Sequence, residues 1–294
     1  MHNFGKVLTA MITPFTADNE VDFDKAKKIA QYLLANGSDG IVLAGSTGES
    51  ATLTVGEKLE LFSVVKKAVG NKAKIIAGTG TNSTKTSLEL SIEAEKTGVD
   101  AVMLVVPYYN KPSQEGLYNH FKTVAEAINL PVVLYNIPGR SVINLLPETV
   151  VKLAQVENIV ALKESAGNMD QFSELKRLLP KNFLLYSGDD SLTLPLLALG
   201  AQGIISVTAH IAGNEIKEMV EAFSSGDHQK ALQIHLNLLP VFKTMFITSN
   251  PVPLKTALNL MGMQVGSVRP PLCDASNAET ERIMLMLKKL KLIN

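Results

Sequence analysis

Short apolar runs alternate with longer amphipathic segments through the first two thirds of this 294-residue chain. This alternation limits the possible folds more than any other feature. The apolar runs are rich in Val, Ile and Leu and lack strict apolar–polar alternation, which indicates parallel strands covered on both faces. The eight predicted strands are Val7–Ile12, Gly40–Leu43, Lys74–Ala77, Ala101–Val106, Val132–Tyr135, Ile159–Lys163, Phe183–Ser187 and Gly203–Val207.

Helical patterns occupy the intervals between these runs. Thr54 and Glu57 have the spacing of a capping box at the start of one of them. The predicted helices are Asp24–Ala35, Thr54–Val69, Thr84–Thr97, Ser113–Ile128, Pro147–Gln155, Asn168–Leu179 and Ser191–Leu199. Eight strands that alternate with helices are typical of an α/β fold of the TIM barrel type, (β/α)8.

The alternation stops near Gly213, and only helical patterns follow it. These predicted helices are Glu215–Phe223, Asp227–Phe246, Pro253–Met261 and Ala275–Leu292. We therefore predict a (β/α)8 catalytic barrel over residues 1–224 and a C-terminal α-helical domain, an appendage to the barrel, over residues 225–294.

Charge and composition exclude several classes of function. The 28 basic and 28 acidic residues balance, so the chain lacks the basic surface that nucleic acids or anionic membranes require. Cys273 is the one cysteine, which fits a reducing cytoplasm, and no signal peptide or membrane span is expected. The five histidines lack metal-ligand spacing, so we expect no metal. Gly78–Gly80 lacks the remaining residues of a nucleotide-binding motif, so we expect no cofactor.

Lys163 is the most informative single residue, because it closes the predicted strand Ile159–Lys163. The active site of a (β/α)8 barrel lies at the carboxyl ends of its strands. An amine is a nucleophile only when it is neutral, and burial in an apolar barrel disfavours the charged form. Lys163 is therefore a candidate for Schiff-base formation with a keto acid. The alternative is a lysine that pairs with Glu164 or extends to water.

Four other polar residues lie at the carboxyl ends of predicted strands, and each has two interpretations. Tyr135 either relays protons beside Lys163 or is a core tyrosine with a satisfied hydroxyl. Ser46 and Thr47 lie in a glycine-bracketed turn that either holds a carboxylate or caps a helix. Arg140 either binds a carboxylate through two hydrogen bonds or forms a surface ion pair.

Four motifs together resemble the dihydrodipicolinate synthase family, over essentially the whole chain. They are Gly45–Glu49, Pro107–Pro112, Tyr135–Arg140 and Ala161–Glu164. The family belongs to the class I pyruvate aldolase superfamily, which includes N-acetylneuraminate lyase. The resemblance implies condensation of pyruvate with L-aspartate 4-semialdehyde to give 4-hydroxy-tetrahydrodipicolinate, in diaminopimelate and lysine biosynthesis.

The resemblance also implies a role for each site residue. Lys163 would form the Schiff base, while Tyr135, Ser46 and Tyr109 would relay protons, with Tyr109 reaching in from a neighbouring subunit. The substrate-binding residues would be Thr47 for the pyruvate carboxylate, Arg140 for the semialdehyde carboxylate, and Gly188 and Ile205 through their backbones, with Tyr108 at the dimer interface. The chain would then be a homo-oligomer, a dimer at least and a tetramer by resemblance.

The chain departs from the family pattern at positions that affect substrate choice and regulation. Ser46 stands where most members have Thr and is more usual in neuraminate lyases, so a retro-aldol lyase acting on a sugar acid such as N-acetylneuraminate is the alternative. Members that lysine inhibits typically carry His or Trp at the position of Val55, often His at Lys58, and Glu at Thr86. We therefore expect weak inhibition by lysine or none, although Ser50 and Asn82 are retained.

Overall fold

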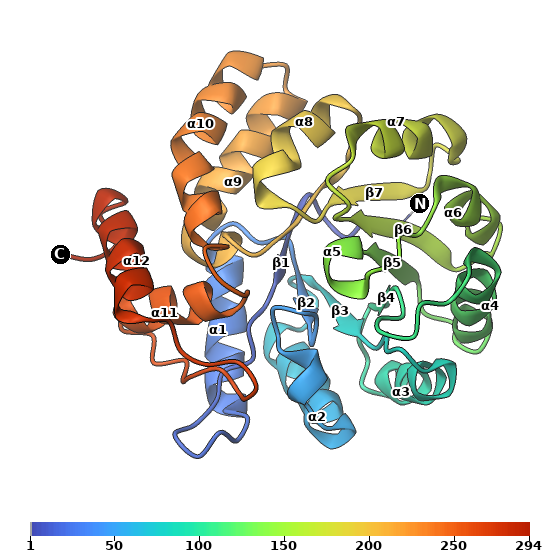
Figure 1. Cartoon of the computed structure of the whole chain (residues 1–294), viewed down its shortest axis with the longest axis horizontal. Coiled ribbons are helices and arrows are strands. Elements are labelled where there is room, and N and C mark those ends of the chain that lie inside the picture. Colours follow the sequence, from blue (N-terminus) through green and yellow to red (C-terminus); the bar gives the residue numbers. More distant parts are fainter. Residues whose placement is uncertain (1) are drawn as a thin grey trace.

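The computed structural model describes residues 2–294, and within that range eight parallel strands form a closed barrel in chain order (Figure 1). Each strand pairs with the next, and β1 pairs with β8. The strands are β1 Val7–Ala10, β2 Gly40–Leu43, β3 Lys74–Gly78, β4 Ala101–Val105, β5 Val132–Asn136, β6 Ile159–Glu164, β7 Leu184–Ser187 and β8 Gly203–Ser206. The predicted (β/α)8 barrel is confirmed, with strand ends that move by at most two residues.

Helices surround the strands in Figure 1 and continue beyond them. They are α1 Phe23–Ala35, α2 Val55–Val69, α3 Thr84–Lys96, α4 Gln114–Ala125, α5 Pro138–Ser141, α6 Pro147–Leu153, α7 Met169–Leu178, α8 Thr193–Ala198, α9 Ala209–Ser224, α10 His228–Thr244, α11 Val252–Leu260 and α12 Asn277–Lys289. Thr54 and Glu57 form the predicted capping box of α2. The sequence analysis missed α5 and the 3-10 helix Ser50–Thr52, which lie in loops at the carboxyl ends of strands. The predicted helix Ser191–Leu199 is divided into the 3-10 helix Asp190–Leu192 and α8.

The predicted start of the helix after β8 is wrong. We expected the helix to begin at Glu215, whereas α9 begins at Ala209 and bends at Ala212, where φ is −139°. Residues 209–213 are all buried, so they show no polar face and no amphipathic period. Helix α9 packs against β1 and α1 and is the last helix of the barrel layer.

Two apolar layers form the core. The larger lies between the strands and the surrounding helices. The smaller fills the interior of the barrel, as in other eight-stranded barrels, and its members include Phe4, Met103, Tyr135, Tyr186 and Ile205. The barrel is therefore a packed core, and the space for a ligand lies at its rim.

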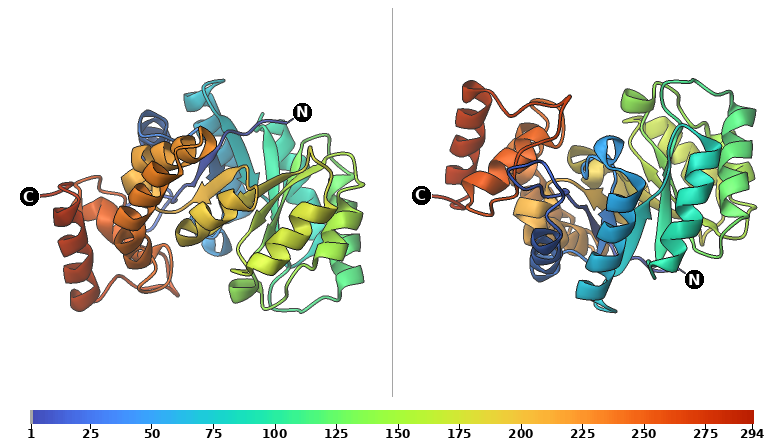
Figure 2. Two further views of the ribbon diagram at one scale, coloured as in Figure 1. Left: turned by 90° about the horizontal axis from the view of Figure 1, so that it is seen from above. Right: turned by 90° about the horizontal axis from the view of Figure 1, so that it is seen from below.

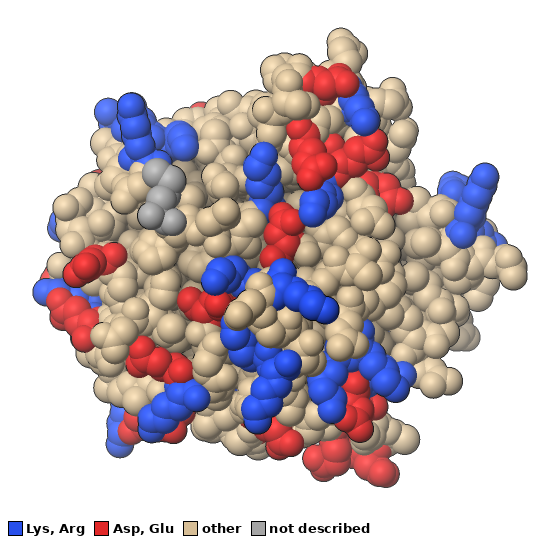
Figure 3. Space-filling model, turned by 180° about the vertical axis from the view of Figure 1, so that it is seen from behind, with Lys and Arg blue, Asp and Glu red and all other residues tan. Residues whose placement is uncertain are grey.

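The C-terminal helices stand to one side of the barrel (Figure 2). Helix α10 packs along α9, and α11 packs with α12 farther out. The division at residues 224 and 225 stays a prediction. The face seen from behind in Figure 3 carries Lys and Arg interspersed with Asp and Glu. No helix within residues 2–294 has the length and apolar character to cross a bilayer.

Candidate active site

The barrel brings Lys163 and Tyr135 together, because β5 and β6 are neighbours and the two residues are register partners. The Lys163 side chain is buried, and its Nζ lies 4.3 Å from the centre of the Tyr135 ring. This is the adjacency that the sequence analysis expected. The amine therefore lies against an aromatic ring, in the interior of the barrel near the carboxyl ends of β5 and β6.

Glu164 does not pair with Lys163, because successive side chains of a strand point to opposite faces. The Glu164 carboxylate accepts hydrogen bonds from Asn136 Nδ2 at 3.1 Å, Gln171 Nε2 at 3.2 Å and the Ala166 N–H at 2.7 Å. Burial raises the pKa of Glu164. Within residues 2–294 no carboxylate forms an ion pair with Lys163, so the alternative of a Lys163–Glu164 pair is wrong.

Gly188 follows β7 and lies against the Lys163 side chain. A Cβ atom at this position would meet Ser165 Oγ at 1.9 Å and Lys163 Cε at 3.0 Å, so a larger residue would displace the Ser165 side chain and press on Lys163. Ser165 Oγ is buried and has no hydrogen-bond partner among the described residues. Ile205 lies in β8 and packs in the barrel interior in the same cluster as Tyr135.

The loop after β2 holds Ser46 and Thr47 between two residues with left-handed backbones. Ala44 has φ 49° and Glu49 has φ 54°, which are unusual angles for residues other than glycine. The buried Thr47 accepts a hydrogen bond through Oγ1 from Asn250 Nδ2 at 2.9 Å. The hydroxyl hydrogen and the backbone N–H of Thr47 form no hydrogen bond within residues 2–294.

Asn250 also contacts Arg140, since Arg140 Nη2 donates to the Asn250 carbonyl oxygen at 3.1 Å. Asn250 therefore joins two predicted substrate-binding residues, and sequence reasoning missed it. It lies 203 positions from Thr47 in the C-terminal segment, outside every strand end. Nothing in its local sequence pattern indicates this contact.

Ser46, Tyr135 and Arg140 line a cavity of about 320 Å³ at the rim of the barrel, whereas the predicted site residues Thr47, Gly188 and Ile205 do not line it. Its lining combines apolar side chains with a few polar ones, as in most small-molecule sites. The lining includes Ser46, Met103, Tyr108, Tyr135, Ile137, Arg140, Asn250, Pro271 and Leu272. Lys163 does not line the cavity, but its amine lies against the ring of Tyr135, which does.

Tyr109, in the loop after β4, does not line this cavity. Tyr108 in the same loop and Arg140 after β5 do line it. The Tyr109 side chain is 88% exposed, and its backbone has φ 77°. A large aromatic side chain and a left-handed backbone together at the surface are uncommon. The single chain therefore leaves Tyr109 apart from its own Lys163.

Comparisons with known proteins agree on one family. The family model described as "Dihydrodipicolinate synthetase family" matches residues 3–290. The chain is 57% identical over 292 residues to the 4-hydroxy-tetrahydrodipicolinate synthase of Desulforamulus reducens, and the match covers 99% of each chain.

Solved structures lead to the same family. The dihydrodipicolinate synthase of Cyanidioschyzon merolae with lysine bound is 47% identical, with TM-score 0.97 and 99% of each chain covered. The chloride-inhibited enzyme of Acinetobacter baumannii complexed with pyruvate is 37% identical, with TM-score 0.96 and coverage of 99% of this chain and 100% of that one.

Proposed function

The chain belongs to the dihydrodipicolinate synthetase family and catalyses 4-hydroxy-tetrahydrodipicolinate synthesis, and from this premise we propose the residues that carry the reaction. Lys163 forms a Schiff base with pyruvate, and the enamine derived from it attacks L-aspartate 4-semialdehyde. One observation above all supports this assignment, the buried Lys163 amine 4.3 Å from the Tyr135 ring at the carboxyl end of the barrel.

Formation of the imine requires protons to move in both directions. The neutral Lys163 amine attacks the keto carbon of pyruvate, the carbonyl oxygen takes a proton, and the resulting hydroxyl leaves as water. A positioned hydroxyl supplies and recovers these protons. We assign that role to Tyr135, which lies beside the amine, in a relay with Ser46 and with Tyr109 from a second copy of the chain.

Two residues bind the carboxylates of the substrates. Thr47 uses its Oγ1 as an acceptor toward Asn250, so its hydroxyl hydrogen and backbone N–H remain available for pyruvate. Arg140 donates one hydrogen bond to Asn250 and forms no ion pair within residues 2–294, so most of its five N–H donors remain for the semialdehyde. Gly188 and Ile205 complete the site through their backbones.

The functional unit requires at least a homodimer in this proposal, because Tyr109 does not reach the cavity of its own chain. A tetramer follows from the family resemblance. The cytoplasmic location expected from the sequence stays a prediction.

A direct comparison of substrates tests the function. We expect turnover of pyruvate with L-aspartate 4-semialdehyde, because Arg140 offers a clamp for a small amino acid carboxylate. We expect no cleavage of N-acetylneuraminate in the same preparation, despite Ser46. Cleavage of the sugar acid at a comparable kcat/KM, measured by release of pyruvate, would contradict the assignment.

Feedback inhibition by lysine is expected to be weak or absent. A bound lysine needs anionic or neutral acceptors for its two ammonium groups, because a buried unpaired cation is costly. Two positions at which lysine-inhibited family members typically carry His and Glu hold Lys58, a buried cation, and Thr86, which is neutral and exposed. Loss of one charge-assisted contact costs ~1.5–3 kcal/mol, roughly 10- to 150-fold in affinity.

A lysine titration of the activity measures this. Half-inhibition is expected only above a millimolar concentration, and half-inhibition well below it would refute the interpretation. As a matched gain-of-function variant, Lys58→His with Thr86→Glu should be at least about ten times more sensitive than the wild-type protein.

A further inference from the structure

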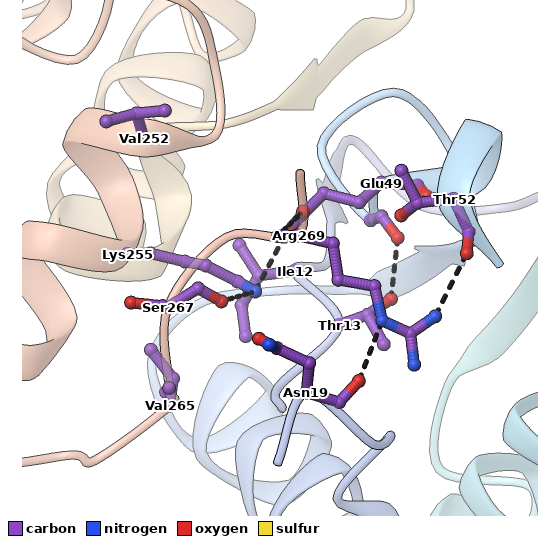
Figure 4. Close-up of polar contacts among 12 residues, drawn as sticks. Ile12, Thr13, Asn19, Glu49, Thr52, Val252, Lys255, Val265, Ser267 and Arg269 are labelled. Carbon is purple, nitrogen blue, oxygen red and sulfur yellow. Dashed lines mark hydrogen bonds and ion pairs between the residues drawn. The ribbon is translucent and has the colours of Figure 1, made fainter. Parts of the chain in front are cut away.

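A buried ion pair joins the C-terminal segment to the loop that carries Ser46 and Thr47. Lys255 in α11 places its Nζ 2.7 Å from Glu49 Oε1, and the two side chains are 2% and 1% exposed. The angles at this contact do not meet the geometry of a hydrogen bond, so the contact is an ion pair. Lys255 Nζ also donates to the Ser267 carbonyl oxygen at 2.8 Å (Figure 4).

Arg269 is a second cation that reaches the same loop from the same segment (Figure 4). Its backbone N–H donates to Glu49 Oε2 at 2.8 Å. Its guanidinium group donates to the Asn19 carbonyl oxygen at 2.8 Å, the Thr52 carbonyl oxygen at 3.0 Å and Glu57 Oε1 at 2.5 Å. Arg269 therefore bonds the C-terminal segment to three parts of the barrel rim, which are the loop of Glu49 and Thr52, the loop of Asn19, and Glu57 in α2.

Both cations lie close to one aromatic ring. The centre of the Phe15 ring is 3.9 Å from Lys255 Nζ and 4.4 Å from Arg269 Cζ. Such cation–aromatic contacts are strongest where water is excluded. Phe15 therefore contributes to holding both cations.

These contacts act on two walls of the cavity. Glu49 ends the loop that carries Ser46 and Thr47 and has a left-handed backbone, which other contacts must maintain. The C-terminal segment itself supplies Pro271 and Leu272 to the cavity lining, two and three residues after Arg269. Displacement of Glu49 would thus move the Ser46–Thr47 loop, and displacement of the Arg269 side chain would move Pro271 and Leu272.

Stability alone does not account for the ion pair. Burial lowers the pKa of Lys255 to about 8, although Glu49 lies beside it. The charged form is therefore held at neutral pH against the cost of removing it from water. Replacement of buried ion pairs by uncharged residues of similar volume is often neutral or stabilising, so such a pair is weak evidence for a stability role.

We propose that Lys255 and Arg269 are positioning residues for the reaction. Lys255, through Glu49, holds the Ser46–Thr47 loop in the geometry that accepts pyruvate. Arg269 holds Pro271 and Leu272 as the wall against which the aldehyde substrate binds. This inference rests on the proposed function, and neither cation needs to touch a substrate.

The test replaces the buried pair with uncharged residues of similar shape, Glu49→Gln with Lys255→Met. We expect the thermal midpoint to stay or rise, because both charges are removed together. The rate at which borohydride traps pyruvate on Lys163, and kcat/KM for pyruvate, should fall on the order of 100-fold, because small displacements of binding groups have effects of that size.

A second ion pair provides the matched control. Lys66 Nζ lies 2.6 Å from Asp100 Oδ2, and both side chains are 17% exposed. Asp100 precedes β4, at the end of the barrel opposite the site. Lys66→Met with Asp100→Asn should leave pyruvate trapping within about twofold of the wild-type rate, since it moves none of the site residues.

Arg269→Ala tests whether Arg269 positions Pro271 and Leu272. It also tests the inference if the Glu49→Gln, Lys255→Met variant does not fold. We expect KM for L-aspartate 4-semialdehyde to rise at least about tenfold while pyruvate trapping stays near the wild-type rate. Wild-type trapping in the double variant, or a wild-type aldehyde KM in Arg269→Ala, overturns the inference alone. Failure of the wild-type protein to trap pyruvate overturns the proposed function as well.

Discussion

Borohydride reduction in the presence of pyruvate is expected to attach a pyruvyl group to Lys163 and to no other lysine. The reason is local, since the Lys163 amine is buried beside Tyr135 and has no carboxylate partner within residues 2–294. A buried amine that holds no carboxylate is free to attack the keto carbon of pyruvate. Mass spectrometry of the digested protein locates the adduct.

Lys163→Ala removes the nucleophile and should lower turnover at least about 10³-fold, as the loss of a covalent catalyst does in other enzymes. The fold should persist, because the barrel interior keeps its other apolar side chains. Lys58→Ala is the control, since Lys58 is also a buried lysine but lies on helix α2. Trapping in Lys163→Ala, or an adduct on a different lysine, would end the proposed mechanism.

The barrel could be predicted from the sequence because its strands are short, apolar and separated by amphipathic helices. The strand ends then placed Tyr135 and Lys163 on adjacent strands without any knowledge of their partners. The start of α9 could not be predicted, since residues 209–213 are buried on every side and carry no helical period. Periodicity identifies an element only where one of its faces meets water.

The wall of the site formed by the C-terminal segment could not be predicted for a different reason. Asn250 contacts Thr47 across 203 positions, and Arg269 contacts Glu49 across 220. Such contacts depend on how the helices after the barrel fold back onto its rim. Neither a motif nor a period in residues 250–272 indicates them, so the sequence analysis treated this segment only as part of a helical appendage.

Mixed oligomers of two inactive variants are expected to regain activity. In the proposed dimer, Tyr109 of each subunit completes the site of the other, because the exposed Tyr109 lies outside the cavity of its own chain. A hybrid of Tyr109→Phe and Lys163→Ala then has one site with both groups intact. Random pairing makes half of the dimers hybrids, so activity should return to about a quarter of the wild-type value.

The pair Tyr135→Phe and Lys163→Ala is the matched control, because both residues belong to the same chain's site. Every hybrid of these two variants lacks one of the groups at each site, so no activity should return. Co-expression of the two chains followed by a steady-state assay measures both combinations, and sedimentation of the wild-type protein gives its assembly. Equal recovery in the two combinations, or full activity in a sedimenting monomer, would show that Tyr109 does not serve a neighbouring site.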